Sequence, residues 1–134
     1  AIAEHMAMDL TKNSKIPAYS LCGATQLTTF ANDYGYEYVY QKAVESFCVP
    51  GDLVIAISSG GESKNMVNAA RMAKKRDTMV ITFTGFDSEN TLSKIGDINI
   101  HVNSYAYGYV EIMHNLLLHY IDDQIIGRAE YKIL

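Results

Sequence analysis

Leu53-Val54-Ile55-Ala56-Ile57 is a continuous apolar run, and it gives the clearest indication of the fold class. Such a run is typical of a strand that is buried on both faces, as in a parallel sheet. The turn signal Pro50-Gly51-Asp52 precedes it, and a Ser/Gly-rich loop over residues 58–63 follows. Apolar residues at helical spacing then predict a helix from Ser63 to Arg76. Strand, loop and helix in this order indicate a βα unit.

The same alternation continues on both sides of this unit. Further strands are expected at residues 17–21, 79–84 and 98–102, and helices at 1–12, within 23–35, and at 36–47, 88–95 and 107–126. This order predicts an α/β protein with a parallel, doubly wound sheet and helices on both faces. Ligands of such sheets bind at the carboxyl ends of the strands, so we expect chemistry in the loops that follow residues 21, 57, 84 and 102.

Composition narrows the class of protein. The 134 residues carry 11 Lys+Arg against 15 Asp+Glu, and 49% are hydrophobic, which suits a single domain over residues 1–134. The net charge of −4 argues against a non-specific nucleic-acid binder but does not exclude a phosphorylated small molecule, which backbone N–H groups can hold. No apolar run approaches the roughly 20 residues of a membrane helix, and no secretory signal is visible. Cys22 and Cys48 are expected to be reduced thiols, which favours a cytoplasmic protein.

The Ser/Gly-rich loop has the features of an anion site. Gly60 and Gly61 allow a sharp turn and close approach of a ligand, and Ser63 suits the N-cap of the next helix. The helix N-terminus favours negative charge, and the hydroxyls of Ser58, Ser59 and Ser63 add donors for phosphate oxygens. The alternative is an ordinary strand-to-helix turn. The loop is neither a dinucleotide fingerprint nor a P-loop, and the missing lysine argues against an NTPase.

Histidines and carboxylates mark two helices. His5 and Asp9 are four residues apart and share a helix face, which suits two metal ligands, a catalytic pair, or a solvated surface pair. Glu111, His114 and His119 lie on the last helix, where Glu111 and His119 are about 12 Å apart along the axis. We expect His114 to be a buried structural histidine. A buried Glu111 would need a partner.

Together these segments resemble the sugar-isomerase (SIS) domain, and within it the phosphoheptose isomerases. Residues 30–36 resemble that family's Asn-Asp-aromatic-Gly-aromatic segment, and residues 51–63 resemble its phosphate loop. Residues 82–85 resemble the Leu-Thr-Gly that ends its next strand. On the last helix, Glu111, His114 and His119 fall on its Gln-x-x-His-x-x-x-x-His pattern.

The resemblance implies a flavodoxin-like three-layer sandwich, a homotetramer and active sites between subunits. The family's catalytic base and acid fall on Asp9 and His119. A zinc ion, bound by many members, would here have the ligands His5, Asp9, Glu111 and His119. The positions that match substrate contacts are Asn32, Asp33, Ser58, Ser59, Gly60, Ser63 and Glu111.

Three positions depart from the family pattern. Asp9 stands in place of glutamate, Glu111 in place of glutamine, and Gly60 in place of a serine. The shorter Asp9 lengthens a proton-transfer distance, and Glu111 adds a negative charge to the zinc ligand set. The family's first strand and its Gly-Asn-Gly-Gly-Ser turn would precede Ala1, so we expect a further N-terminal segment.

The leading interpretation is a cytoplasmic isomerase that converts sedoheptulose 7-phosphate to heptose 7-phosphate through an enediol. That product would feed lipopolysaccharide or capsule synthesis. The alternative is a non-catalytic SIS module that binds a phosphosugar or a protein, such as a protein that binds the replication initiator. A third interpretation is an isomerase acting on a different sugar phosphate.

Overall fold

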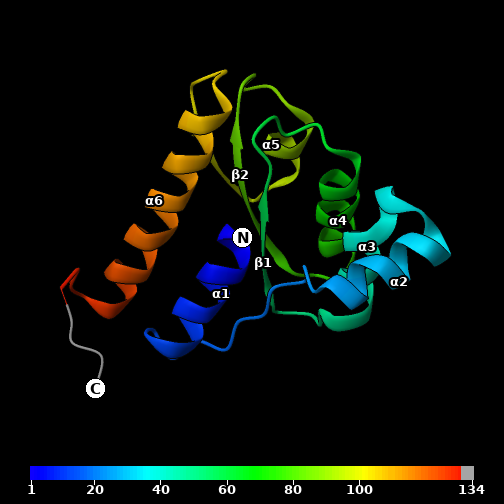
Figure 1. Ribbon diagram of the computed structural model, residues 1–134, viewed down its shortest axis with the longest axis horizontal. Coiled ribbons are helices and arrows are strands. Elements are labelled where there is room, and N and C mark those ends of the chain that lie inside the picture. The colour runs from blue at the N-terminus through cyan, green and yellow to red at the C-terminus, as the bar shows by residue number, and fades with distance from the viewer. Residues whose placement is uncertain (131–134) are drawn as a thin grey trace.

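Three parallel strands form the centre of the molecule, in the order β1-β2-β3 (Figure 1). They are β1 (Leu53–Ile57), β2 (Met79–Gly85) and β3 (Ile98–Val102). In the register of the sheet, Leu53 lies opposite Met79, and Ile81 lies opposite Ile98. The computed structural model describes residues 1–130.

Helices cover both faces of this sheet. They are α1 (Ile2–Lys12), α2 (Ala24–Tyr34), the 3₁₀ turn η1 (Tyr36–Tyr38), α3 (Val39–Phe47), α4 (Lys64–Lys75), α5 (Thr91–Ile95) and α6 (Tyr107–Ile126). Helices α3, α4 and α5 lie on one face, and α1 and α6 lie side by side on the other (Figure 1). The expected three-layer α/β architecture is confirmed. No helix within residues 1–130 is long and apolar enough to cross a membrane.

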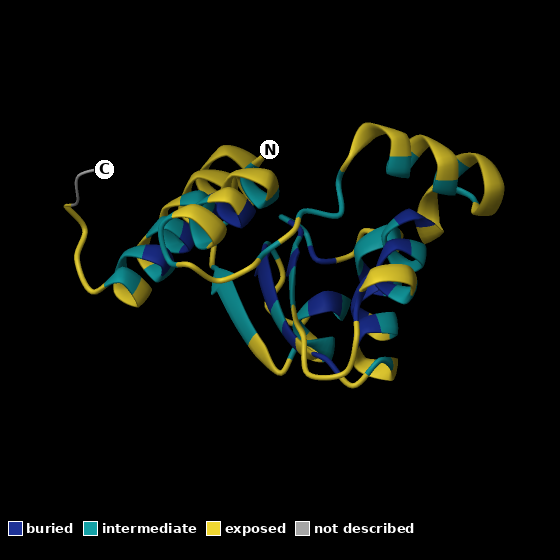
Figure 2. Ribbon diagram, turned by 90° about the horizontal axis from the view of Figure 1, so that it is seen from below, coloured by how far each residue is buried: buried dark blue, intermediate teal, exposed yellow. Residues whose placement is uncertain are grey.

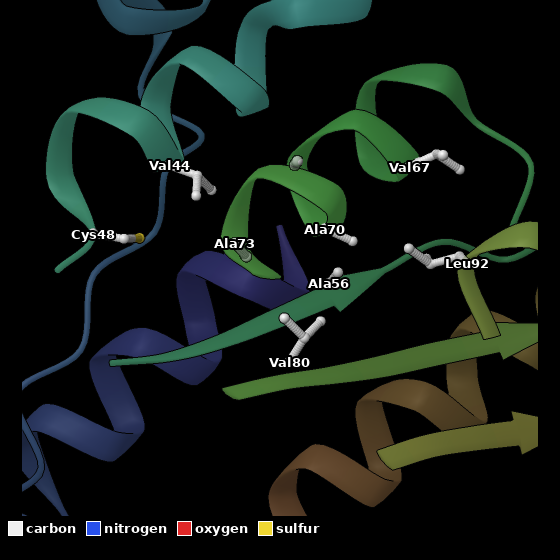
Figure 3. Packing of buried hydrophobic residues seen from close by; sticks show 9 residues of the cluster. Val44, Cys48, Ala56, Val67, Ala70, Ala73, Val80 and Leu92 are labelled. Atoms are coloured by element: carbon white, nitrogen blue, oxygen red, sulfur yellow. The ribbon is translucent and has the colours of Figure 1, made fainter. Parts of the chain in front are cut away.

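Two apolar clusters hold the layers together, one on each face of the sheet. On the first face, Ala70 and Ala73 of α4 and Val44 of α3 pack over Ala56 and Val80 (Figure 3). Alanine at the contact lets α4 approach the strands closely. The second cluster joins α1 and α6 to the opposite face of the strands through Met6, Phe83 and Leu118. Alternate residues of β1 and of β2 therefore pack against opposite layers.

Burial is uneven across the sheet. The middle strand β2 is the most buried of the three (Figure 2). Val80 and Phe83 of β2 are fully buried, whereas Leu53 at the start of β1 is 51% exposed. The expectation that β1 is buried on both faces is therefore met only at Ala56. Within residues 1–130, β1 pairs with β2 alone and lies at an edge of the sheet. An apolar run indicates burial but does not say how many neighbours a strand has.

Other expectations need correction. Residues 17–21 form no strand, because they pair with none of the strands in residues 1–130, although Leu21 packs against the first cluster. The predicted helix at 88–95 begins three residues later, where the Asn90 side chain caps it by accepting from Ser93 N–H at 2.9 Å. Cys22 and Cys48 are free thiols, as expected, and burial raises the pKa of Cys48.

The loop after β1 needs glycine at residue 61. Gly61 has a φ of +70°, which side chains of L-residues rarely adopt, and a Cβ there would overlap the Asn90 side chain. The Gly61 carbonyl also accepts a hydrogen bond from Leu92 N–H at 3.0 Å. The loop is thereby fixed to the start of α5.

We expect Gly61→Ala to lower the free energy of unfolding by about 1–3 kcal/mol, because alanine is strained at positive φ and meets Asn90 there. Urea unfolding followed by circular dichroism measures this change. Gly108→Ala is the matched control, since Gly108 lies in α6 with open space around its Cβ position. An equal effect of both substitutions would contradict the prediction.

Candidate active site

The Ser/Gly-rich loop folds at the carboxyl end of β1, where the sequence places it. The Ser58 hydroxyl is buried and accepts a hydrogen bond from Gly61 N–H at 3.2 Å. Ser63 is the N-cap residue of α4, but its side chain makes no capping bond and lies 3.5 Å from Ser58 Oγ. The Ser63 hydroxyl is therefore directed toward the loop and not used to cap the helix.

This loop forms one wall of a cleft of about 660 Å³. The lining residues are Tyr40, Ile57, Ser58, Ser59, Gly60, Glu62, Ser63, Asn65, Met66, Phe86 and Tyr107. Hydroxyls and the N-terminus of α4 on one wall suit an anionic group, and the aromatic rings suit an apolar face of a ligand.

The carboxylate of Glu62, which lines this cleft, is hydrogen-bonded to Thr91. Glu62 accepts hydrogen bonds from the backbone N–H and the hydroxyl of Thr91, at 2.6 and 2.8 Å. These two bonds lower the pKa of Glu62. Glu62 is therefore ionised, and its carboxylate is held at the start of α5.

Phe86, which the sequence analysis did not single out, lines another side of the cleft. Phe86 has a φ of +60°, and its N–H donates to the Ser104 carbonyl at 3.0 Å. Its ring stacks on Tyr105 at a centroid distance of 5.7 Å and meets the edge of Tyr107 at 4.8 Å. The available signal was the position of Phe86 directly after the glycine that ends β2.

A second group of side chains gathers where α1 packs against α6. Asp9 Oδ2 lies 3.1 Å from His5 Nε2 and 3.5 Å from His119 Nδ1. The two imidazole rings meet edge to face, with centroids 5.0 Å apart. Helix spacing placed His5 beside Asp9, and the tertiary packing adds His119, which is 110 residues further along the chain than Asp9.

These three side chains have the chemistry of a zinc site. Their donor atoms all lie within 4.8 Å of one another. Two nitrogen donors and one carboxylate oxygen form a typical catalytic zinc set, which leaves a fourth position open. Tetrahedral zinc bonds of about 2.0–2.1 Å place donor atoms roughly 3.3 Å apart, which agrees with the two distances to Asp9 Oδ2.

Glu111 lies apart from this group. Its Oε1 accepts a hydrogen bond of 3.4 Å from Ser59 Oγ in the Ser/Gly-rich loop. Among the residues described, the cluster of possible metal ligands contains His5, Asp9 and His119. Glu111 thus connects α6 to the cleft, two turns before the helix reaches His119.

Asn32 and Asp33 lie elsewhere on this chain. Both are exposed near the end of α2, and Asn32 Nδ2 donates to Asp33 Oδ1 at 3.1 Å. Neither lines the cleft formed by the loop. The fold of one chain therefore leaves these two side chains open to solvent or to a partner.

His114 is buried in the layer between α6 and the sheet, as the sequence predicts. Its Nε2 donates to the Thr84 carbonyl at 3.0 Å, and its ring meets the edge of Phe83. Burial lowers the pKa of His114, an effect that the bond to Thr84 partly opposes. His114 therefore stabilises the fold as a neutral imidazole.

The SIS domain family matches residues 25–114, a range that includes the Ser/Gly-rich loop, β1, β2, β3 and the start of α6. The chain belongs to the SIS domain family. Curated relatives of this SIS domain include phosphoheptose isomerases of Helicobacter hepaticus, 35% identical over 131 residues, and Shewanella piezotolerans, 32% identical over 131 residues. These alignments cover 93% and 92% of the chain, which spans 66% of the length of each relative.

Solved structures give the same result for the fold of this SIS domain. The phosphoheptose isomerase GmhA of Neisseria gonorrhoeae superposes with a TM-score of 0.84 at 30% identity, over 92% of this chain and 68% of that one. A phosphoheptose isomerase of Francisella tularensis superposes with a TM-score of 0.86 at 26% identity, over 95% and 71% of the two chains. The three layers described above are thus shared with both structures.

His114 makes stability depend on pH. Because its pKa is lowered in the folded state, the unfolded state takes up the proton first as the pH falls below about 6.5. Stability is therefore lost on acidification, by at most about 1.4 kcal/mol per pH unit from this group. His114→Gln should flatten this dependence, which urea unfolding midpoints between pH 5 and 7.5 measure. A variant as steep as the wild type would contradict the assignment.

Proposed function

We propose that the protein is a phosphoheptose isomerase, which interconverts sedoheptulose 7-phosphate and D-glycero-D-manno-heptose 7-phosphate. The observation that carries this proposal is that one helix, α6, contacts both the Ser/Gly-rich loop and the group formed by His5 and Asp9. Glu111 contacts Ser59 of the anion-binding loop, and His119, further along the same helix, lies beside Asp9. One helix thereby relates a phosphate-binding end to an end that can move protons. The names of the relatives agree with this reading.

The phosphate is held at the Ser/Gly-rich loop. Ser63 donates a hydroxyl hydrogen bond to its oxygens, and Ser59 does so when it exchanges its bond to Glu111 for one to the phosphate. The N-terminus of α4 adds backbone donors and a favourable dipole. Gly60 carries no side chain, so the backbone can approach the phosphate closely. Ser58 acts mainly on the loop itself, since its hydroxyl already accepts from Gly61 N–H.

Asp9 and His119 carry the proton in the isomerisation. One of them removes a proton from C1 of the ketose, the C1–C2 enediol forms, and a proton is returned to C2 as the C1 oxygen becomes the aldehyde. His119 Nδ1 faces Asp9, so Nε2 is the nitrogen available to the substrate.

His5, Asp9 and His119 are the residues that would hold a zinc ion. When bound, zinc supplies a Lewis acid that polarises the carbonyl and hydroxyl oxygens at the reacting carbons. Glu111 is proposed to join this ligand set or to contact the sugar after a change of rotamer. In the structure its carboxylate accepts a hydrogen bond from Ser59.

The proposed assembly is a homotetramer with active sites between subunits. Its support is an exposed apolar stripe along α6, formed by Tyr109, Ile112, Met113, Leu116 and Tyr120. Exposed apolar stripes of this kind mark protein interfaces. Asn32 and Asp33 lie outside the cleft of their own chain. In the proposed assembly they would reach the sugar hydroxyls in the site of a neighbouring subunit. A cytoplasmic location and a role in heptose supply for lipopolysaccharide or capsule complete the proposal.

We expect the full protein to elute as a tetramer at micromolar concentration in size-exclusion chromatography with light scattering. Leu116→Asp should dissociate it, because a charge is placed within the apolar stripe. A wild-type protein that remains a monomer would contradict the shared active site.

We expect His119→Gln to reduce turnover by at least about 100-fold while the protein stays folded, because a positioned acid or base contributes that much. The full protein is incubated with sedoheptulose 7-phosphate in D₂O and followed by NMR, with circular dichroism as the control for folding. Aldose formation by the wild type supports the isomerase. Binding of the sugar with neither conversion nor deuterium exchange would instead identify a phosphosugar-binding module, and exchange without aldose would indicate a different sugar phosphate.

A further inference from the structure

A buried carboxylate, that of Asp122, lies close to the proposed metal ligands His5, Asp9 and His119 and has no part in the proposed reaction. Asp122 of α6 is only 1% exposed and stands one turn after His119. Its Oδ1 accepts from Ser14 Oγ at 2.5 Å, and its Oδ2 accepts from Asn13 Nδ2 at 3.4 Å. A buried carboxylate is costly unless it is hydrogen-bonded, so these contacts are what allow Asp122 to be there.

Asn13 connects this buried carboxylate to Asp9. The same Nδ2 group that faces Asp122 also donates to Asp9 Oδ1 at 3.3 Å. The backbone repeats the connection, since Asn13 N–H donates to the Asp9 carbonyl at 2.7 Å at the end of α1. Asp9 is therefore held by Asn13 through both its side chain and its main chain.

The two oxygens of Asp9 consequently have different partners. Oδ1 is bound by Asn13, and Oδ2 faces both His5 Nε2 and His119 Nδ1. Without the amide, the carboxylate can rotate about χ2 and present either oxygen or neither. Partners that bind the outer side of a metal ligand typically change metal affinity by 10–100-fold.

We propose that Asn13 is a positioning residue, anchored by Asp122, which orients the Asp9 carboxylate so that one oxygen is presented with the two imidazoles to a divalent cation. The inference rests on the proposed function for its catalytic consequence but not for its metal-binding consequence. Asp122 couples the two helices, because it belongs to the helix of His119 and is bound by the segment that follows Asp9.

The test is the affinity of the full protein for Zn²⁺ alone, measured by competition with a chromophoric chelator. Asn13→Ala should weaken Zn²⁺ binding 10–100-fold. Asp122→Asn should weaken it by a smaller factor, because one acceptor of the Asn13 amide changes. Asn68→Ala, which removes an amide that donates to the Glu37 carbonyl, is the matched control and should bind Zn²⁺ like the wild type.

Ser14→Ala separates positioning from folding. It removes the other partner of Asp122 but leaves the bond between Asn13 and Asp9, so it should lower the urea midpoint and change Zn²⁺ affinity by less than the Asn13 variant does. Wild-type Zn²⁺ affinity in Asn13→Ala, with only a lower urea midpoint, would overturn the proposal, as would a wild-type protein that binds no Zn²⁺.

Turnover of sedoheptulose 7-phosphate is measured in parallel. Turnover without Zn²⁺ binding refutes this inference alone, and Zn²⁺ binding without turnover refutes the isomerase alone.

Discussion

The packing of α1 against α6 on one face of the sheet is the contact on which the site depends. Met6 and Leu118 meet over Phe83, and this apolar contact brings Asp9 and His119 within 3.5 Å of each other. Burial of apolar side chains is not directional, so the cluster supplies stability but does not set the positions of polar atoms. The hydrogen bonds among Asn13, Ser14 and Asp122 set the positions of the polar atoms, because hydrogen bonds depend on distance and angle.

The end of the site proposed to bind the phosphate has a different physical basis. Its loop is a local structure, made by the end of β1, a glycine at positive φ and the first turn of α4. Asn90 and Glu62 then fasten it to α5, one by filling the space beside Gly61 and the other by binding Thr91. The two ends of the site are thus built independently and are related by α6, whose length separates Glu111 from His119 by about 12 Å.

Membership of the SIS domain family accounts for the three layers and the loop, and the departures from the family pattern show where this chain uses other side chains. Asp9 is shorter than the glutamate of the pattern, and its carboxylate is supported by Asn13 from the following turn. Glu111 has the same length as the glutamine of the pattern but carries a negative charge, and its carboxylate accepts a hydrogen bond from the Ser59 hydroxyl. The apolar stripe on α6 stays exposed in the part of the chain that the structure describes, and it is the surface that the proposed assembly would use.

Most of the helices and strands, and the types of side chain in the site, could be predicted from the sequence. Apolar runs located β1, β2 and β3, and the four-residue spacing of His5 and Asp9 placed them on one helix face, because both patterns follow from local backbone geometry. The tertiary structure decided what depends on contacts between distant residues. It left residues 17–21 without a strand partner, joined His119 to His5 and Asp9, turned Glu111 toward Ser59 and placed the Asn13 amide on the buried Asp122. Local periodicity reports which face of an element is buried, and only packing in three dimensions decides what lies against that face.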